Sequence, residues 1–305
     1  MSRSSANTAV SVSRDRGSLS DWIQLTKPRI LQLNLVAAFG GYWLASRWMA
    51  DWGLLCWMLL GTTLTMASSC VINNIWDREL DRKMSRTKDR PLATGRLNIR
   101  GVLVYALALG IGGEAVLFWK VNALCGWLGL LGMFVYIVIY TMWLKRTSTW
   151  STSVGGVSGA MPPVIGYCAF THEADAGALL LFALLFLWQP AHFWSLAIRR
   201  VDEYRAAGFP LLPVRKGVPR TKLQMIPYVV LLLPTTVLIY AYGYAGVMFL
   251  TVSLLAGLVW VWHTLTGPAA SDNGKWAKTN FLISVNYLTA VFIIMILDTT
   301  GRPIL

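Results

Sequence analysis

Three side chains that carry oxygen acceptors recur at four-residue intervals just after a long uncharged apolar run. Asn73, Asp77 and Asp81 stand at positions i, i+4 and i+8, and on an α-helix this spacing puts all three on one face, about 6 Å apart per step. Mg²⁺ takes oxygen ligands and commonly binds one or two carboxylates together with substrate phosphates and water. The spacing therefore predicts a Mg²⁺ site that holds a diphosphate. A solvated loop whose acids only balance its bases would need no such face.

Basic residues follow these acids directly in the pattern R-T-x-x-R-P. Arg86 and Arg90 supply guanidinium groups for paired phosphate contacts, and Pro91 moves Arg90 out of helical geometry. Metal-binding carboxylates beside anion-binding arginines suit the ionisation of an allylic diphosphate, in which charge develops on the leaving group. We therefore predict Asp77, Asp81, Arg86 and Arg90 as catalytic residues.

The elements that position these residues are expected to be membrane-spanning helices. Of the 305 residues, 55% are hydrophobic and 13% are charged, which is too apolar for an ordinary soluble domain. The expected fold is an all-α polytopic membrane protein with about nine transmembrane helices around a central cavity open to the cytoplasmic side. The apolar runs lie at 30–48, 53–75, 101–119, 122–143, 153–171, 178–198, 225–243, 245–263 and 280–298. Residues 1–20 are expected to be a disordered cytoplasmic tail and residues 21–305 a single transmembrane domain.

The net charge of +13 has an explanation other than a polyanionic partner. With the N-terminus placed in the cytoplasm, the expected inside segments hold 24 of the 27 Lys and Arg residues, which is the positive-inside pattern. No nucleic acid partner is expected. The Ser- and Arg-rich start lacks an apolar signal core and would also suit an organellar transit peptide, but its short length favours a bacterial inner membrane. The four cysteines stand singly in apolar runs, which indicates packing rather than disulfides or metal ligation.

A second polar cluster lies at and after the sixth expected span. His192 is an ionisable residue inside this span, so it is a candidate for contact with a porphyrin, including iron ligation; the alternative is a histidine hydrogen-bonded between helices. Asp202 and Glu203 are adjacent and diverge by about 100° on a helix, so only one of them shares a metal with Asp77 easily. We predict Asp202 as the metal ligand and Arg205 as an anion contact.

Several of these segments together resemble the UbiA superfamily of intramembrane prenyltransferases and, within it, the protohaem IX farnesyltransferases. The N-x-x-x-D-x-x-x-D stretch at the end of a second span, followed by R-T-x-x-R-P-L, looks like the first signature of the superfamily. Further matching segments are KPRI (27–30), YTMWLKR (140–146), GGVSGAMPPVIGYCA (155–169) and QPAHFWSLAIRRVDEYRAAGFPLLPV (189–214). The chain departs from the superfamily pattern after the sixth span, where Ala206 stands in place of a second acid four residues beyond Asp202.

The resemblance implies the reaction and its partners. It implies transfer of a farnesyl group from farnesyl diphosphate to a vinyl group of haem b, assisted by Mg²⁺, in a lipid membrane. Asn73, Asn74, Lys145, Arg146, His192, Asp202 and Arg205 would contact substrates, and Asn73, Asp77, Asp81 and Asp202 would hold the metal. A haem A synthase or a terminal oxidase is the implied protein partner.

Three alternatives stay open from the sequence. The nearest is a related prenyltransferase that uses a quinone precursor or a chlorin. A transporter would place acids or bases near mid-span, whereas these cluster at the cytoplasmic ends. A haem-binding assembly factor without catalysis would need His192 but not Asp77 and Asp81.

Overall fold

The computed structural model describes residues 17–300 and is built from helices, with no strand in that range. In chain order the α-helices are α1 (Leu19–Leu25), α2 (Pro28–Ser46), α3 (Trp52–Asp81), α4 (Ile99–Val116), α5 (Ala123–Phe134), α6 (Lys145–Thr147), α7 (Ser151–Gly159), α8 (Met161–Thr171), α9 (Ala176–Arg199), α10 (Val201–Ala206), α11 (Leu212–Arg215), α12 (Gly217–Ala241), α13 (Val247–Leu265) and α14 (Asn273–Leu297). Two π-helical segments, η1 (Leu117–Val121) and η2 (Val135–Leu144), extend α4 and α5, and a short 3₁₀ turn, η3 (Gly267–Ala269), follows α13.

Seven helices of the described range are long and apolar enough to cross a membrane. They contain α3, α4, α5, α9, α12, α13 and α14, and each coincides with an expected apolar run. The other two expected runs correspond to α2, whose apolar character is diluted by Gln32 and Asn34, and to the pair α7 and α8, which is interrupted at Ala160 before Pro162 and Pro163. The all-helical membrane fold is confirmed, and the count of nine spans stays a prediction.

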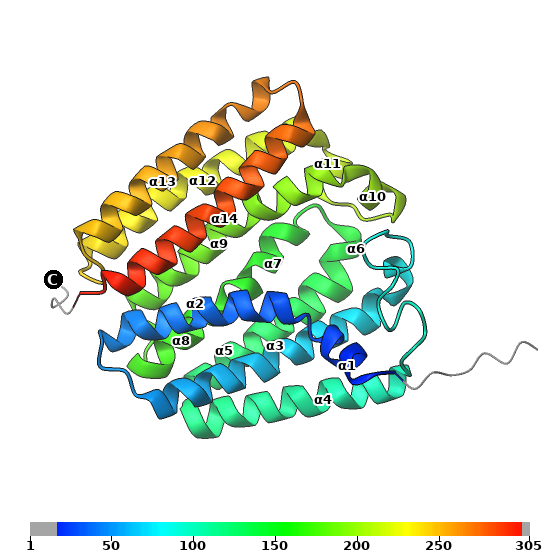
Figure 1. Cartoon of the computed structure of the whole chain (residues 1–305), viewed down its shortest axis with the longest axis horizontal. Helices are drawn as coiled ribbons and strands as arrows, with labels where there is room; N and C mark the ends of the chain where they lie inside the picture. The colour runs from blue at the N-terminus through cyan, green and yellow to red at the C-terminus, as the bar shows by residue number, and fades with distance from the viewer. Residues whose placement is uncertain (1–16, 301–305) are drawn as a thin grey trace, which may run out of the picture.

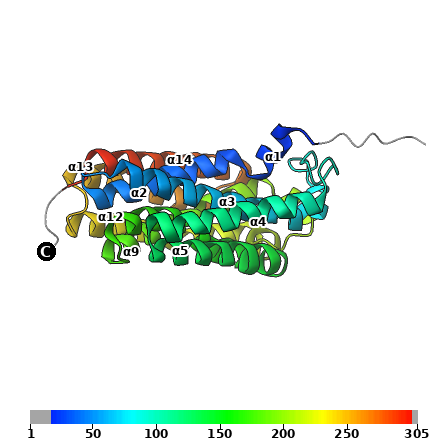
Figure 2. The ribbon, with the colours of Figure 1, turned by 90° about the horizontal axis from the view of Figure 1, so that it is seen from below.

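The long helices run along one common direction, and their connections gather at two opposite ends (Figures 1 and 2). Residues 82–98, α6, α10, α11 and the connection between α13 and α14 lie at the same end as α1. The positively charged segments that the sequence assigns to one compartment therefore meet at one end of the bundle. A central cavity around which all helices are arranged stays a prediction.

Helices α2 and α8 approach each other closely because glycines stand at their contact. A Cβ atom on Gly41 would lie 2.0 Å from the carbonyl oxygen of Pro163, and one on Gly166 would lie 1.9 Å from that of Ala38. Only hydrogen fits at such a contact. The small-residue segment 155–169 thus serves helix packing, and Gln189 of α9 also joins it by donating to the carbonyl of Gly156.

Helix α1 replaces the last part of the predicted N-terminal tail. Ser18 and Asp21 form a capping box at its start, and Asp21 pairs with Arg96 at 3.0 Å. Hydrogen bonding and the Arg96 charge hold the pKa of Asp21 below its usual value, against the opposing effect of burial. The helix starts at Leu19, whereas the prediction placed the end of the tail at residue 20; residues 1–16 lie outside the described range.

Candidate active site

The last two turns of α3 carry the predicted acidic face, and it is buried. Asn73, Asp77 and Asp81 are 2%, 1% and 6% exposed, all within one continuous helix that ends at Asp81. Ionised carboxylates stay buried only when charges or strong hydrogen bonds compensate them. The groups that surround these two acids therefore define the site.

Asp77 is the centre of this site. Lys145 of α6 donates to its Oδ2, and Asn73 Nδ2 donates to the same atom at 2.9 Å. The Arg146 guanidinium lies 3.6 Å from Asp77 Oδ1, an oxygen that has no hydrogen-bond partner in the described part of the chain. Two predicted substrate contacts, Lys145 and Arg146, thus meet the predicted metal ligand directly.

Asp81 is paired with Arg90, as the adjacent acidic and basic motifs would allow. Arg90 Nη1 lies 2.8 Å from Asp81 Oδ2, and Thr87 Oγ1 donates to the Asp81 carbonyl at 3.0 Å, which folds the loop back on the helix end. Arg86 lies exposed in this loop. Arg90 is therefore at the site, while Arg86 is near it in sequence but free to reach toward an anion.

Lys27 is a site residue that the sequence reasoning did not single out. It stands in the left-handed region, with φ 56°, immediately before Pro28 of α2, and its Nζ donates to Asn73 Oδ1. Removal from water lowers the pKa of Lys27 to about 8, and the nearby Arg90 and Lys145 charges act in the same direction. The matched KPRI segment was the signal that could have found it.

Thr141 also reaches the site, from η2. Its Oγ1 accepts a hydrogen bond from Asn73 Nδ2 at 3.1 Å, so that Asn73 is held by α2, α3 and η2 together. Asn74, by contrast, is turned to α1: its Nδ2 donates to the carbonyls of Leu25 and Cys70, both at 2.9 Å. Asn74 therefore anchors α1, and its contact with substrate stays a prediction.

Helix α10 packs over this end of the bundle, but Asp202 does not turn inward. Its side chain is 88% exposed and pairs with Arg205 on the same helix. Glu203 is less exposed, at 37%, and its Oε2 is a buried oxygen without a hydrogen-bond partner in the described part of the chain, 3.8 Å from Arg200. Asp202 and Arg205 thus pair with each other at the surface, and Glu203 has the less exposed carboxylate of the two adjacent acids. Contact of Asp202 with the metal and of Arg205 with an anion stays a prediction.

The packing of α10 is set by an apolar contact with the loop after α3. Ala207 and Phe209 pack on Met84, with Leu80 and Tyr204 alongside. The Phe209 ring lies 5.4 Å from Lys145 Nζ, and the Tyr140 ring lies 5.7 Å from it. Aromatic faces therefore cover the cationic side of the site.

His192 lies apart from the acidic face, between α9 and α14. Its ring is stacked between Trp188 and Phe281, with centroids 4.2 and 4.6 Å away, and its Nδ1 lies 2.8 Å from Ser284 Oγ. This matches the alternative of a histidine hydrogen-bonded between helices. Porphyrin contact through the other ring nitrogen stays a prediction.

The donor set suits a hard divalent cation. Asn73, Asp77 and Asp81 contribute amide and carboxylate oxygens on one buried face, and Asp77 Oδ1 is left without a hydrogen bond. No cluster of three His, Cys, Asp or Glu side chains with metal-binding spacing occurs within residues 17–300, so phosphate and water would have to complete the shell.

The fold and the site together define an intramembrane prenyltransferase. A model of the UbiA prenyltransferase family matches residues 34–286, and the chain belongs to that family. With its seven apolar helices it is an integral membrane protein.

Particular relatives and solved structures sharpen this assignment. "Protoheme IX farnesyltransferase 1" of Bacillus subtilis (strain 168) is 42% identical over 295 residues, covering 93% of this chain and 92% of that protein. "Protoheme IX farnesyltransferase" of Klebsiella pneumoniae is 42% identical over 277 residues, covering 91% and 94%. In fold, the chain is similar to a solved digeranylgeranylglyceryl phosphate synthase, with TM-score 0.78, 16% identity and coverage of 92% and 98%. It is also similar to a UbiA homolog from Archaeoglobus fulgidus bound to DMAPP and Mg²⁺, with TM-score 0.64, 16% identity and coverage of 90% and 99%.

Proposed function

We propose that this protein transfers the farnesyl group of farnesyl diphosphate to a vinyl group of protohaem IX, giving haem O. The observation that carries the reaction type is the position of Asp77. It is a buried carboxylate near the C-terminal end of the apolar helix α3, surrounded by Asn73, Lys145 and Arg146. The acceptor is supported by the relatives named protohaem IX farnesyltransferase.

Mg²⁺ would be held by Asn73, Asp77 and Asp81, and it would neutralise charge on the diphosphate as that group departs. The solved UbiA homolog with DMAPP and Mg²⁺ supports this choice of ion. For a further acid we propose Glu203 in place of Asp202, because Glu203 has a buried oxygen that accepts no hydrogen bond while Asp202 is exposed.

The chain's own cations bind and orient the diphosphate. Lys27, Arg90, Lys145 and Arg146 all contact the acidic face, and Arg86 extends the set from the loop. They favour cleavage of the bond between C1 of the prenyl chain and oxygen, because positive charge placed in advance stabilises the negative charge that develops on the leaving group.

The aromatic cover keeps water from the allylic cation until the acceptor reacts. Tyr140 and Phe209 lie over the Lys145 side of the site, where their faces stabilise positive charge. A vinyl carbon of the acceptor then forms a bond with C1, and water adds to the resulting cationic carbon and loses a proton, which gives the hydroxyethylfarnesyl side chain.

Product analysis tests this function. Purified protein is incubated with haem b, farnesyl diphosphate and Mg²⁺, and the haem products are separated by chromatography and identified by mass spectrometry. The Asp77→Asn variant is assayed in parallel as the control. We expect a hydroxyethylfarnesyl haem with the native protein and none with the variant. Prenylation of a phenolic acid or a chlorin instead would keep the chemistry and replace the acceptor. Haem binding without any prenyl transfer would favour an assembly factor.

For its location we propose a bacterial inner membrane with the charged end in the cytoplasm. The segregation of basic residues to one end supports this orientation. A haem A synthase or a terminal oxidase is proposed as the receiver of the product, and co-purification from membranes tests that association.

A further inference from the structure

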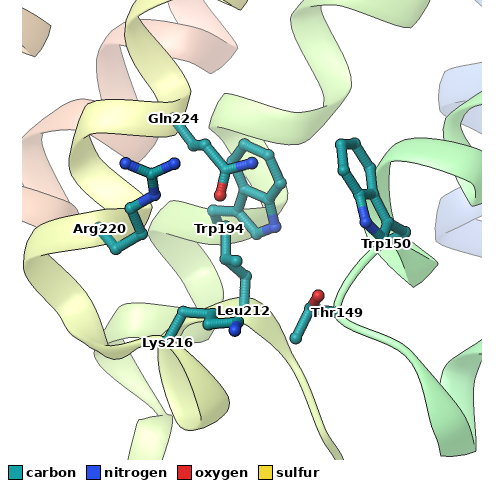
Figure 3. Close-up of a pocket in the computed structure, with 7 residues that line it drawn as sticks. All are labelled: Thr149, Trp150, Trp194, Leu212, Lys216, Arg220 and Gln224. Carbon is teal, nitrogen blue, oxygen red and sulfur yellow. The ribbon is translucent and has the colours of Figure 1, made fainter.

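A cavity of about 220 Å³ lies between the start of α7, the end of α9 and the start of α12 (Figure 3). Its lining residues are Thr149, Trp150, Trp194, Leu212, Lys216, Arg220 and Gln224. A second cavity, of about 410 Å³, adjoins it and shares Thr149 and Lys216. Neither Lys216 nor Arg220 has a function in the mechanism above.

The polar groups of this cavity are mostly hydrogen-bond donors. Arg220 and Gln224 stand four residues apart on α12 and share one face of that helix, and Lys216 immediately precedes its first residue. No carboxylate lines the cavity, and neither Lys216 nor Arg220 forms an ion pair within residues 17–300. The positive-inside rule explains the presence of these cations but not their convergence on a cavity.

Trp194 provides an independent sign that the cavity suits a hydrogen-bond acceptor. It is 1% exposed, and its indole Nε1 is buried without a hydrogen-bond partner in the described part of the chain. Figure 3 shows the nitrogen edges of Trp194 and Trp150 turned toward the space between them. A buried donor left without a hydrogen bond is unfavourable, so an acceptor atom is expected to enter this space.

Residues that line the two cavities are sequence neighbours of residues around Asp77. Lys145 and Arg146 contact Asp77, and the following residues 147–150 line the two cavities. On the other side, Phe209 covers Lys145, and the next residue, Pro210, lines the second cavity. A molecule seated here would have one part in the cavity and another part near the allylic carbon.

We propose that this cavity binds a propionate arm of the tetrapyrrole acceptor, with Lys216, Arg220 and the Trp194 N–H as its contacts. The proposal rests on the function proposed above. A carboxylate accepts from all three donors and cannot donate, which matches the lining. The volume is below the range of about 300–1,000 Å³ of pockets for whole drug-sized ligands, so it suits one arm of the macrocycle. The diphosphate is already assigned to the basic side chains that contact Asp77 and Asp81.

The test compares haem b with its dimethyl ester, in which both propionates have lost their charge. For the native protein we expect the ester to have a KM about tenfold higher. Arg220→Gln, and Trp194→Phe, which keeps a large ring in the core, should raise the KM for haem b several-fold and leave the KM for the ester and for farnesyl diphosphate unchanged. Arg100→Gln, an exposed arginine at the same end, is the matched control and should behave as native.

Three results would overturn the proposal. One is an equal change in KM for haem b and the ester. Another is a change in KM for farnesyl diphosphate, which would assign the cavity to the diphosphate. The third is an effect that appears only with anionic phospholipid present, which would assign it to a lipid headgroup.

A binding titration separates failure of this proposal from failure of the proposed function. Haem b and its ester are titrated into the native and variant proteins without farnesyl diphosphate, and binding is followed by haem absorption. If the native protein forms no farnesylated haem yet prefers haem b over the ester through Arg220, the cavity assignment stands and the reaction falls. If product forms and the variants show no such preference change, the reaction stands and the cavity assignment falls.

Discussion

At the scale of single residues, the most unusual feature is that side-chain donors already bind the carboxylate oxygens that would ligate a metal. Lys145 and Asn73 both donate to Asp77 Oδ2, and Arg90 pairs with Asp81. When metal and diphosphate bind, these cations are expected to move from the carboxylates to the phosphate oxygens. Charge balance is then kept in both states, which a buried site requires.

Replacement of Lys145 by methionine tests this exchange. The change removes a positive charge that compensates the buried Asp77 carboxylate, so we expect lower thermal stability without Mg²⁺. Added Mg²⁺ should stabilise the variant more than the native protein, because a ligand that binds only the folded state stabilises it. The KM for farnesyl diphosphate should rise about tenfold or more. Lys83→Met, at an exposed position of the adjacent loop, should change neither quantity. Equal stabilisation of native and Lys145→Met proteins by Mg²⁺ would contradict the exchange.

Glu203 and Asp202 give a second comparison at this scale. Glu203→Gln removes the charge of the carboxylate whose buried oxygen accepts no hydrogen bond, and it is expected to lower kcat about tenfold or more. Asp202→Asn alters only an exposed ion pair with Arg205, so its rate should stay within about twofold. Initial rates of product formation at saturating Mg²⁺ measure both. A larger loss in Asp202→Asn would restore the assignment made from the sequence.

At the scale of elements, the sequence predicts what depends on local spacing. The face formed by Asn73, Asp77 and Asp81 follows from helical periodicity alone and is present in α3. Lys27 and Thr141 reach Asn73 from 46 and 68 residues away, so they depend on helix packing. Whether Asp202 or Glu203 turns inward depends on how α10 packs on Met84, which local spacing does not determine.

The contact between α2 and α8 is an element-scale feature with its own test. Gly166→Ala would place a methyl group 1.9 Å from the carbonyl oxygen of Ala38, so the helices must separate. We expect a loss of about 1–3 kcal/mol in the free energy of unfolding. Gly112→Ala is the control, because a Cβ there meets no atom within 4 Å and alanine favours a helix. Denaturant unfolding in detergent measures both, and equal stability of the two variants would refute close packing at Gly166.

At the scale of the whole molecule, the bundle has two chemically different ends. The site end contains the acidic face, the two cavities and the connection after α13, where Lys222 donates to the Gly267 carbonyl. At the opposite end hydrogen bonds join the short connections, such as Trp48 to the Thr299 carbonyl and Asn122 to the Cys168 carbonyl. Polar substrates would therefore enter at one end, with the prenyl chain extending along the apolar helices.

The orientation of this bundle is open to direct measurement. Ser271 lies exposed in the connection between α13 and α14 at the site end, and Ala174 lies exposed between α8 and α9 at the other end. With the four native cysteines replaced by alanine, Ser271→Cys and Ala174→Cys supply one thiol each. Because basic residues gather at the site end, we expect a membrane-impermeant maleimide to label Ala174→Cys when it is applied from the outer side of the inner membrane. Ser271→Cys should react only after the membrane is permeabilised, and the reverse pattern would place the site end outside and refute a cytoplasmic supply of farnesyl diphosphate.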